Sequence, residues 1–225
     1  MKRVYIDISL YYNLIMNHVK HRYEAIYNNI GGWCTVEKAN KLIDLVDQTN
    51  PNLVVELGVF YGKSLIALAM ASKQKNPFSV CIGIDPWKAE HCLEGNNDKA
   101  NNDWWAKINY DEVYTSASKL MERENVSSIV RLWKQKSSEA ASIFKENSID
   151  ILHQDSNHSE EITCEEVELF WNKVRPEGIW IFDDTNWPTT KKAQGLLVSK
   201  GYTEIHNHEL NGQAWKVYKR NLLSV

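Results

Sequence analysis

Residues 53–64 have the sequence Leu53-Val-Val-Glu-Leu-Gly-Val-Phe-Tyr-Gly-Lys-Ser64, and this stretch decides the fold. Its first five residues are apolar apart from Glu56, which predicts a short strand buried on both faces. Gly58 and Gly62 bound a tight turn, and the apolar residues between 63 and 72 predict a helix after it. A buried strand, a glycine-bounded turn and a helix form the opening unit of an α/β fold.

The rest of the chain continues this alternation of strands and helices. Strands are predicted at 78–84, 128–133, 149–154 and 178–182, with helices at 63–72, 112–124, 138–145 and 161–174. Right-handed crossovers then place helices on both faces of a doubly wound, mostly parallel, Rossmann-like sheet. Asn211-Gly212, a turn sequence typical of β-hairpins, lies between two further predicted strands at 202–210 and 213–218. The sheet is therefore expected to end in an antiparallel hairpin.

Two segments do not follow the pattern. Residues 1–50 predict an N-terminal helical extension to a domain at 51–225. Between about residues 87 and 111 the periodicity fails, and the chain is rich in Asn, Asp, Lys and Trp, including Trp104-Trp105. Long segments of this kind in compact domains often cover a binding site, so we expect a lid-like insertion here.

The composition excludes several classes of protein. A net charge of −3 argues against a surface built for nucleic acid or for anionic lipid. No apolar run approaches the roughly 20 residues that span a bilayer, and the first residues have no apolar signal core. The four cysteines form no CxxC pair, which predicts free thiols in a reducing, cytoplasmic setting. These features are typical of an enzyme acting on small molecules, and a homo-oligomer is compatible with them.

Acidic side chains stand at the ends of four predicted strands. Glu56 lies near the end of the first strand, Asp85 follows the second, Asp155 follows the fourth, and Asp183 with Asp184 follows the fifth. The carboxyl ends of parallel strands share one edge of the sheet, where ligands bind. Asp85 is placed to accept both hydroxyls of a ribose. Glu56, beside the glycine turn, would repel the pyrophosphate of a dinucleotide.

Three segments carry a resemblance to a known family. The stretch from Val54 to Ser64 closely resembles the S-adenosylmethionine (SAM) loop of class I methyltransferases, in the branch with E-x-G-V-x-x-G-x-S. Residues 150–158 look like that branch's D-x-x-H-x-D-x-x-H segment, and residues 175–184 look like its K-P-G-G-x-x-x-x-D-D segment. This branch includes small-molecule and sugar O-methyltransferases of the macrocin type. The resemblance covers about residues 50–190 and departs from the pattern at Lys63 and Glu177.

The resemblance implies a set of binding residues. Glu56 and Gly58 would lie near the methionine part of SAM, Asp85 on the ribose, and Ser137 or Ser138 near the adenine. The other residues expected around the cofactor are Tyr61, Gly62, Ser64, Trp87 and Asp155. In macrocin-type relatives the acids that match Asp155, Asp183 and Asp184 hold a divalent metal, which would be Mg²⁺, Mn²⁺ or Ca²⁺.

The implied reaction is the transfer of a methyl group from SAM to a hydroxyl of a small molecule or sugar, with His158 or Asp155 taking the proton. Three crowded carboxylates repel one another unless a cation or protons neutralise them, so metal-assisted and metal-free forms both remain open. Two rival functions are a non-catalytic SAM- or partner-binding protein and a nicotinamide-dependent oxidoreductase. The acidic balance weighs against RNA methylation.

Overall fold

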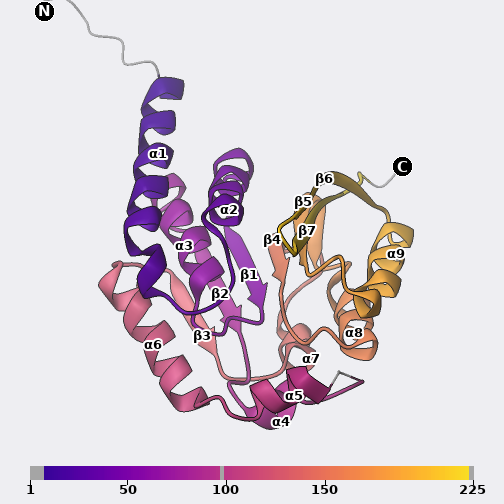
Figure 1. Ribbon diagram of the computed structural model, residues 1–225. Coiled ribbons are helices and arrows are strands. Elements are labelled where there is room, and N and C mark those ends of the chain that lie inside the picture. Colours follow the sequence, from indigo (N-terminus) through magenta and orange to yellow (C-terminus); the bar gives the residue numbers. More distant parts are fainter. Residues whose placement is uncertain (1–7, 97–98, 223–225) are drawn as a thin grey trace, which may run out of the picture.

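The computed structural model describes residues 8–96 and 99–222, with residues 8–13 described by their backbone alone. Within these residues the chain forms a mixed sheet with the strand order β3-β2-β1-β4-β5-β7-β6 (Figure 1). The strands are β1 (Leu53–Leu57), β2 (Val80–Ile84), β3 (Val130–Trp133), β4 (Ile149–Gln154), β5 (Val174–Asp183), β6 (Tyr202–Leu210) and β7 (Gln213–Arg220). No helix of the described part is both long and apolar enough to cross a lipid bilayer.

The pairing of the strands confirms the predicted mostly parallel sheet with an antiparallel end. β1 to β5 pair in parallel, while β7 runs antiparallel to both β5 and β6. At the hairpin, Asn211 has a φ of 53° and Gly212 a φ of 80°. Two successive positive φ angles are what the commonest two-residue hairpin turn requires, and asparagine followed by glycine adopts them at little cost.

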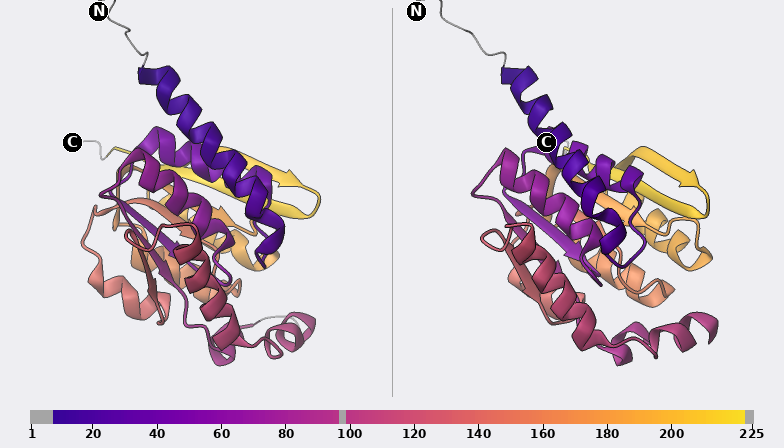
Figure 2. Two further views of the ribbon diagram at one scale, coloured as in Figure 1. Left: turned by 90° about the vertical axis from the view of Figure 1, so that its left-hand side faces the viewer. Right: turned by 60° about the vertical axis from the view of Figure 1, so that its left-hand side comes forward.

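Helices cover both faces of the sheet, as expected for a doubly wound fold (Figures 1 and 2). One face carries α1 (Ile8–Ile26), α2 (Val36–Thr49), α3 (Lys63–Lys75) and α6 (Tyr110–Arg123), and the other carries α7 (Ser137–Ala140), α8 (Glu160–Phe170) and α9 (Lys191–Ser199). Short 3-10 turns lie at Tyr27–Asn29, Ala141–Ile143 and Pro188–Thr190. The first turns of α1 project beyond the rest of the fold (Figure 2).

Helix α2 packs against the sheet through a regular apolar face. Thr35 caps its start, because the threonine hydroxyl accepts a hydrogen bond from the backbone N–H of Lys38 at 3.2 Å. Ala39, Leu42 and Val46 on this face are fully buried in the same core as α1, α3 and β1. The N-terminal helices therefore share the core of the sheet, and their status as a separate unit stays a prediction.

Several boundaries differ from the sequence-based expectation, and two of them are the starts of strands that lead to acids of the site. The strand predicted from Phe78 begins at Val80, because the backbone N–H of Ser79 closes a turn onto the carbonyl of Asn76 at 3.0 Å. The strand predicted from Gly178 begins earlier, at Val174, through an irregular register with β4 that accommodates Pro176. The ends of both strands lie within one residue of the expected positions, so Asp85 and Asp183 keep their places at the carboxyl edge of the sheet.

The segment at 87–111 is more ordered than its composition suggested. It contains α4 (Ala89–Cys92) and α5 (Lys99–Trp105), and α6 begins at Tyr110 after the capping side chain of Asn109. Residues 97 and 98 of the predicted insertion lie outside the described residues. Helices of one or two turns are too short to show the periodicity from which helices are predicted.

Candidate active site

The turn after β1 is packed directly against the loop after β4. Gly58 has a φ of 81°, and its backbone N–H donates to the carbonyl of Ile84 at 2.9 Å. A methyl group added at Gly58 would overlap the backbone carbonyl of Asp155 and would lie 2.7 Å from the Cα of Ser156. Only glycine fits here, and the contact brings the first strand's turn beside the predicted catalytic loop.

Asp85 holds the same turn from the other side. Its Oδ2 accepts the backbone N–H groups of Val59 at 3.0 Å and Phe60 at 2.9 Å, and its Oδ1 accepts that of Trp87 at 2.7 Å. Burial raises the pKa of Asp85, and these three N–H groups oppose that rise. Asp85 also lines the cavity next to the turn.

Two residues predicted to contact the cofactor, Glu56 and Trp87, are buried behind the residues that line the cavity. Glu56 is fully buried, where its two carboxylate oxygens meet the hydroxyl of Ser64 at 2.8 Å and Nδ1 of His153 at 3.2 Å. Trp87 is buried as well, and its indole N–H donates to the carbonyl of Phe60 at 3.0 Å. Neither side chain lines the cavity, so the direct contacts predicted for them remain untested.

One cavity joins the predicted cofactor and acceptor residues. Its volume is about 610 Å³, within the range of sites for small organic ligands. The predicted site residues that line it are Gly58, Tyr61, Ser64, Asp85, Ser137, Ser138, Asp155, His158, Asp183 and Asp184. Gly62 lies behind its own turn, where an added methyl group would meet Met121 at 2.8 Å.

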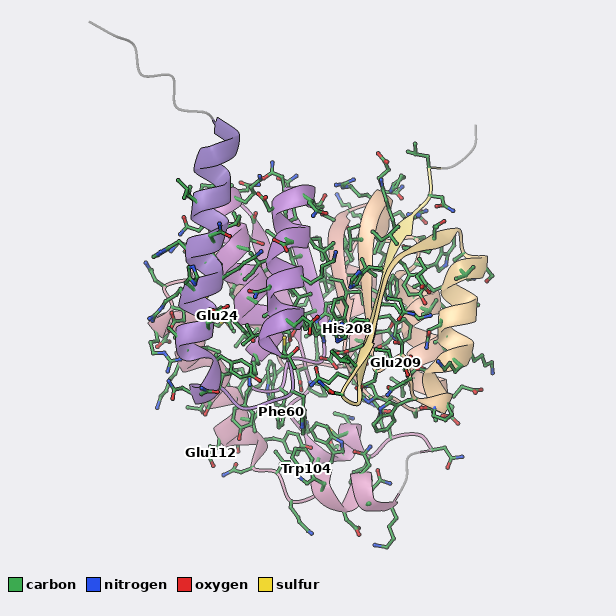
Figure 3. The ribbon with its side chains drawn as sticks, turned by 45° about the horizontal axis from the view of Figure 1, so that its top comes forward. Glu24, Phe60, Trp104, Glu112, His208 and Glu209 are labelled. Atoms are coloured by element: carbon green, nitrogen blue, oxygen red, sulfur yellow. The ribbon has the colours of Figure 1, made fainter. Side chains whose placement is uncertain are left out.

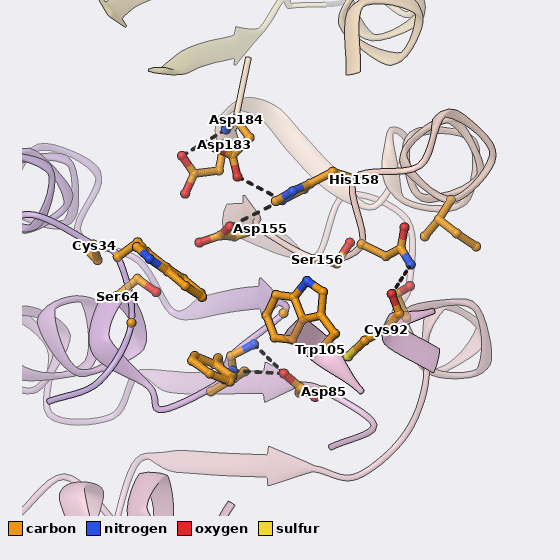
Figure 4. A pocket seen from close by; sticks show the side chains of 18 of the residues that line it. Cys34, Ser64, Asp85, Cys92, Trp105, Asp155, Ser156, His158, Asp183 and Asp184 are labelled. Carbon is orange, nitrogen blue, oxygen red and sulfur yellow. Dashed lines mark hydrogen bonds and ion pairs between the residues drawn. The ribbon is translucent and has the colours of Figure 1, made fainter. Parts of the chain in front are cut away.

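Asp155, Asp183, Asp184 and His158 gather at the ends of β4 and β5 (Figure 4). Nε2 of His158 lies 3.1 Å from Oδ2 of Asp184 and 3.8 Å from Oδ1 of Asp155. Burial alone would lower the pKa of His158, but the neighbouring carboxylates of Asp155 and Asp184 raise it to about 9. At neutral pH the imidazole is therefore a cation that forms ion pairs with these two carboxylates.

Sequence reasoning missed Lys38, which belongs to this cluster. Its ammonium contacts the carboxylate of Asp183 and lies 3.6 Å from Oδ2 of Asp155. The residue is only 2% exposed and lines the cavity. Burial opposes the charge, yet the carboxylates of Asp183 and Asp155 raise the pKa of Lys38 above its usual range. One feature of the sequence indicated a buried role for Lys38: the lysine lies on the apolar face of a helix, one turn before Leu42.

These contacts bear on the predicted metal. The ligand atoms of His153, Asp155 and Asp183 lie within 4.8 Å of one another, and so do those of Asp155, His158 and Asp184. Oxygen donors of this kind suit Mg²⁺ or Mn²⁺. Between Asp155 and Asp183, however, the ammonium of Lys38 already holds the position of a cation. The predicted set of three aspartates therefore fits a metal poorly while Lys38 is in place.

A second residue outside the prediction, Glu166, lies beside Ser137 and Ser138 in the cavity lining. It is 1% exposed, and its Oε2 accepts hydrogen bonds from Nε2 of Gln154 at 2.8 Å and the hydroxyl of Ser156 at 2.7 Å. Burial raises the pKa of Glu166. Its Oε1 has no protein partner, which leaves a buried acceptor oxygen beside the lining serines.

Four aromatic rings from three parts of the chain meet around the cavity. Trp33 stacks on Phe60 with ring centroids 5.6 Å apart, and the centroids of Phe60 and Trp105 are 5.4 Å apart. The Phe60 and Trp104 rings, 6.1 Å apart, lie on neighbouring segments (Figure 3). The two tryptophans of α5 are 4.8 Å apart. We refer to Trp33, Phe60, Trp104 and Trp105 as the aromatic cluster. It connects the insertion to the glycine turn and to the segment before α2.

The beginning of the insertion is fixed by polar contacts instead. The side-chain amide of Asn157 donates to the carbonyls of His91 at 3.3 Å, Cys92 at 3.2 Å and Glu94 at 2.9 Å. The carboxylate of Glu94 in turn lies 2.5 Å from the ammonium of Lys136. Residues around α4 are thus tied to the loops after β3 and β4.

The strand order and the cavity at the carboxyl edge define the class I methyltransferase fold. Residues 55–185, more than half of the chain, match the model of the family described as a methyltransferase domain. The chain therefore belongs to the methyltransferase-domain family. Lys38, Trp33 and the closing hairpin lie outside the matched residues.

Known proteins are similar to this chain over different shares of their length. A curated relative, an uncharacterized protein of Sinorhizobium fredii, is 25% identical over 142 residues, which are 63% of this chain and only 14% of the relative's length. Among solved structures, the O-methyltransferase TomG of Streptomyces achromogenes, involved in tomaymycin synthesis and crystallised with SAM, has a TM-score of 0.61 at 13% identity, with 92% of this chain and 89% of that chain covered. An O-methyltransferase of Bacillus cereus in complex with S-adenosylhomocysteine has a TM-score of 0.57 at 14% identity, with 91% and 89% covered. At such identities the likeness concerns the fold.

Proposed function

We propose that this chain transfers a methyl group from SAM to a hydroxyl oxygen of a small molecule or sugar. One observation carries the proposal: a single cavity joins the Asp85-supported glycine turn to the cluster of Asp155, His158 and Asp184. The first part suits a nucleoside cofactor, and the second suits an acceptor that loses a proton. That O-methyltransferases of known structure share the fold supports the choice of reaction.

SAM suits the cofactor side better than a dinucleotide does. The carboxylate of Glu56 lies directly below the turn, held by Ser64 and His153, and would repel a pyrophosphate. The sulfonium and ammonium of SAM are cations, so the same carboxylate favours them. Asp85 keeps lone pairs for the ribose hydroxyls, and Ser137, Ser138 and the free oxygen of Glu166 suit the polar edge of the adenine.

On the acceptor side, we assign the proton to Asp155. The pKa of Asp155 is lowered because Lys38 and His158 outweigh its burial, so this carboxylate is ionised and able to accept. His158 is already a cation at neutral pH, and its role is to orient the carboxylates of Asp155 and Asp184. Methyl transfer from a sulfonium disperses charge, so a cavity closed to water and good alignment supply much of the rate.

Of the two forms that the sequence left open, the geometry favours metal-free transfer. A divalent ion between Asp155 and Asp183 would have to displace the ammonium of Lys38, which contacts Asp183 and is only 2% exposed. If Mg²⁺ were bound, Asp155, His158 and Asp184 would be the candidate ligands, and the ion would supply a lowered pKa for the acceptor hydroxyl.

Calorimetry with SAM and with NAD tests the cofactor. We expect micromolar binding of SAM and none of comparable strength for NAD. Asp85→Ala should weaken SAM binding by about 1–3 kcal/mol, the usual effect of losing hydrogen bonds to a charged group. Tighter binding of NAD would contradict the proposal.

A screen of hydroxylated compounds, read by mass spectrometry as the gain of one methyl group, tests the reaction itself. A protein that binds SAM, methylates an accepted compound and loses this activity in Asp155→Asn has the proposed function. A protein that binds SAM yet methylates nothing across phenols, sugars and aliphatic alcohols would instead be the non-catalytic SAM-binding alternative.

A further inference from the structure

A side chain of the protein itself supplies a positive charge to the aspartates at the ends of β4 and β5. Asp155 and Asp183 end two adjacent parallel strands, so their carboxylates lie close together and repel each other. Burial strengthens that repulsion, because few water molecules reach the pair to screen it. A fixed positive charge within about 4 Å of both oxygens resolves the conflict.

Lys38 supplies this charge from a distant part of the chain. Its ammonium contacts Asp183 and lies 3.6 Å from Asp155, while its aliphatic stem passes through the buried face of α2. The neighbouring Ala39 and Leu42 are fully buried and fix the helix against the sheet. The charge therefore has a set position, unlike that of a surface lysine.

We propose that the ammonium of Lys38 takes the place of a divalent metal in the acceptor site, so that the chain positions its carboxylates and the acceptor oxygen without a metal ion. The inference rests on the proposed function for its catalytic part, but not for its cation-binding part. Lys38 is a positioning residue that acts through Asp155 and Asp183.

Binding of Mn²⁺, followed by electron paramagnetic resonance of the free ion, tests the cation-binding part without any substrate. The wild-type protein should leave the signal of added Mn²⁺ unchanged. Lys38→Ala removes the built-in cation and should create a site for one Mn²⁺ ion, about tenfold or more tighter than any wild-type binding. The double variant Lys38→Ala with Asp183→Asn should lose that site again.

Lys41→Ala is the matched control. Lys41 lies on the same helix, is only half-buried and makes no ion pair with Asp155 or Asp183 among the described contacts. Its removal changes the net charge equally and should create no Mn²⁺ site. Binding of one Mn²⁺ ion by the wild-type protein that Asp183→Asn abolishes would overturn the proposal, as would the absence of a new site in a folded Lys38→Ala protein.

Turnover tests the catalytic part once an acceptor is known. Exhaustive treatment with EDTA should leave wild-type activity unchanged, whereas Lys38→Met should lower kcat about 100-fold with little change in the Kd for SAM. If Lys38→Met unfolds, Lys38→Met with Asp183→Asn replaces the whole pair by neutral side chains, folds without an unpaired buried charge and should still lack activity. Loss of wild-type activity in EDTA with recovery in Mn²⁺ would overturn the inference.

The two proposals fail in different ways. If the wild-type protein does not bind SAM, the proposed function is wrong, and the Mn²⁺ results on Lys38→Ala still decide the nature of the cation site. If SAM binds and methyl transfer needs Mg²⁺ or Mn²⁺, the proposed function stands and the role of Lys38 is wrong.

Discussion

At Gly58 two loops meet without room for a side chain, and this contact is accessible to a simple test. Gly58→Ala combines a left-handed backbone with a clash against the backbone at Asp155 and Ser156. We expect its free energy of unfolding to fall by about 2–4 kcal/mol, and SAM binding to be lost, because the turn must move. Urea denaturation and calorimetry measure the two effects.

Gly201→Ala is the control for backbone strain alone. Gly201 has a similar φ of 88°, but an added methyl group there meets nothing within 4 Å. Its cost should stay near 1 kcal/mol, with SAM binding unchanged. Equal effects of the two substitutions would show that the contact between Gly58 and the loop after β4 has no special role.

His158 should make stability depend on pH in the weakly alkaline range. Its pKa is raised from 6.5 to about 9 in the folded protein by Asp155 and Asp184, against the opposing effect of burial. A raised pKa means that the stabilisation is fully present below about pH 6.5 and is lost as the pH rises through 9. In EDTA, wild-type stability should therefore decline between pH 6.5 and 9.5 more steeply than that of His158→Gln.

His21→Gln serves as the control for this pH effect. The side chain of His21 is 80% exposed and far in sequence from the cluster, so its loss should leave the slope unchanged. A wild-type slope equal to that of His158→Gln would mean that the carboxylates do not hold the imidazolium.

At single positions, the local sequence pattern predicted the site residues at strand ends. It missed a site residue that a distant helix brings to the same place. Asp85, Asp155 and Asp183 follow strands, so topology alone placed them at one edge of the sheet. Lys38 reaches the same place only through the packing of α2 on the sheet, which no local pattern encodes. Glu56 contacts Ser64 and His153 and does not line the cavity, so its expected contact with the cofactor stays a prediction.

At the scale of elements, the insertion should behave as two parts. Residues around α4 are held by Asn157 through three carbonyls, whereas α5 is held by aromatic contacts with Trp33 and Phe60. We expect hydrogen exchange in α5 to slow when SAM and an acceptor bind, with α4 protected in both states. Mass-detected exchange resolves the two helices.

Two further results would test this prediction about hydrogen exchange in α4 and α5. Asn157→Ala should raise exchange at residues 89–94 in the free protein, because their carbonyls lose a common donor. Strong and equal protection of α5 with and without ligands would identify the insertion as a fixed structural element instead of a lid.

The regular elements of the fold were predictable because each has a strong local signal. Five buried parallel strands, their helices and the Asn211-Gly212 hairpin were all expected at nearly their observed positions. The starts of β2 and β5 were not, since a turn at Asn76 and an irregular register near Pro176 depend on neighbouring chain segments. The short helices α4 and α5 carry too few residues for a periodic pattern.

At the scale of the whole molecule, the site depends on helices outside the matched methyltransferase residues. Leu42 of α2 is fully buried in the core, so Leu42→Ala should lower the free energy of unfolding by about 2–5 kcal/mol. A chain of residues 51–225 alone should fail to fold, because α3 would expose the face that α1 and α2 cover. Circular dichroism and urea denaturation check both statements.

The contrary result is equally clear. If residues 51–225 folded and bound SAM with unchanged affinity, the N-terminal extension would be an independent unit and its core contacts with α3 would be dispensable.

The aromatic cluster also gives the protein an optical property. Trp33 lies 5.1 Å from Trp104 and 6.0 Å from Trp105, so the electronic transitions of these indoles couple and excitation energy migrates between them. Separation of α5 from the glycine turn would uncouple the rings and change both the near-ultraviolet dichroism and the polarisation of the emitted light. If the insertion moves as a lid, its motion can therefore be followed in the unlabelled protein, on the microsecond-to-millisecond timescale typical of such segments.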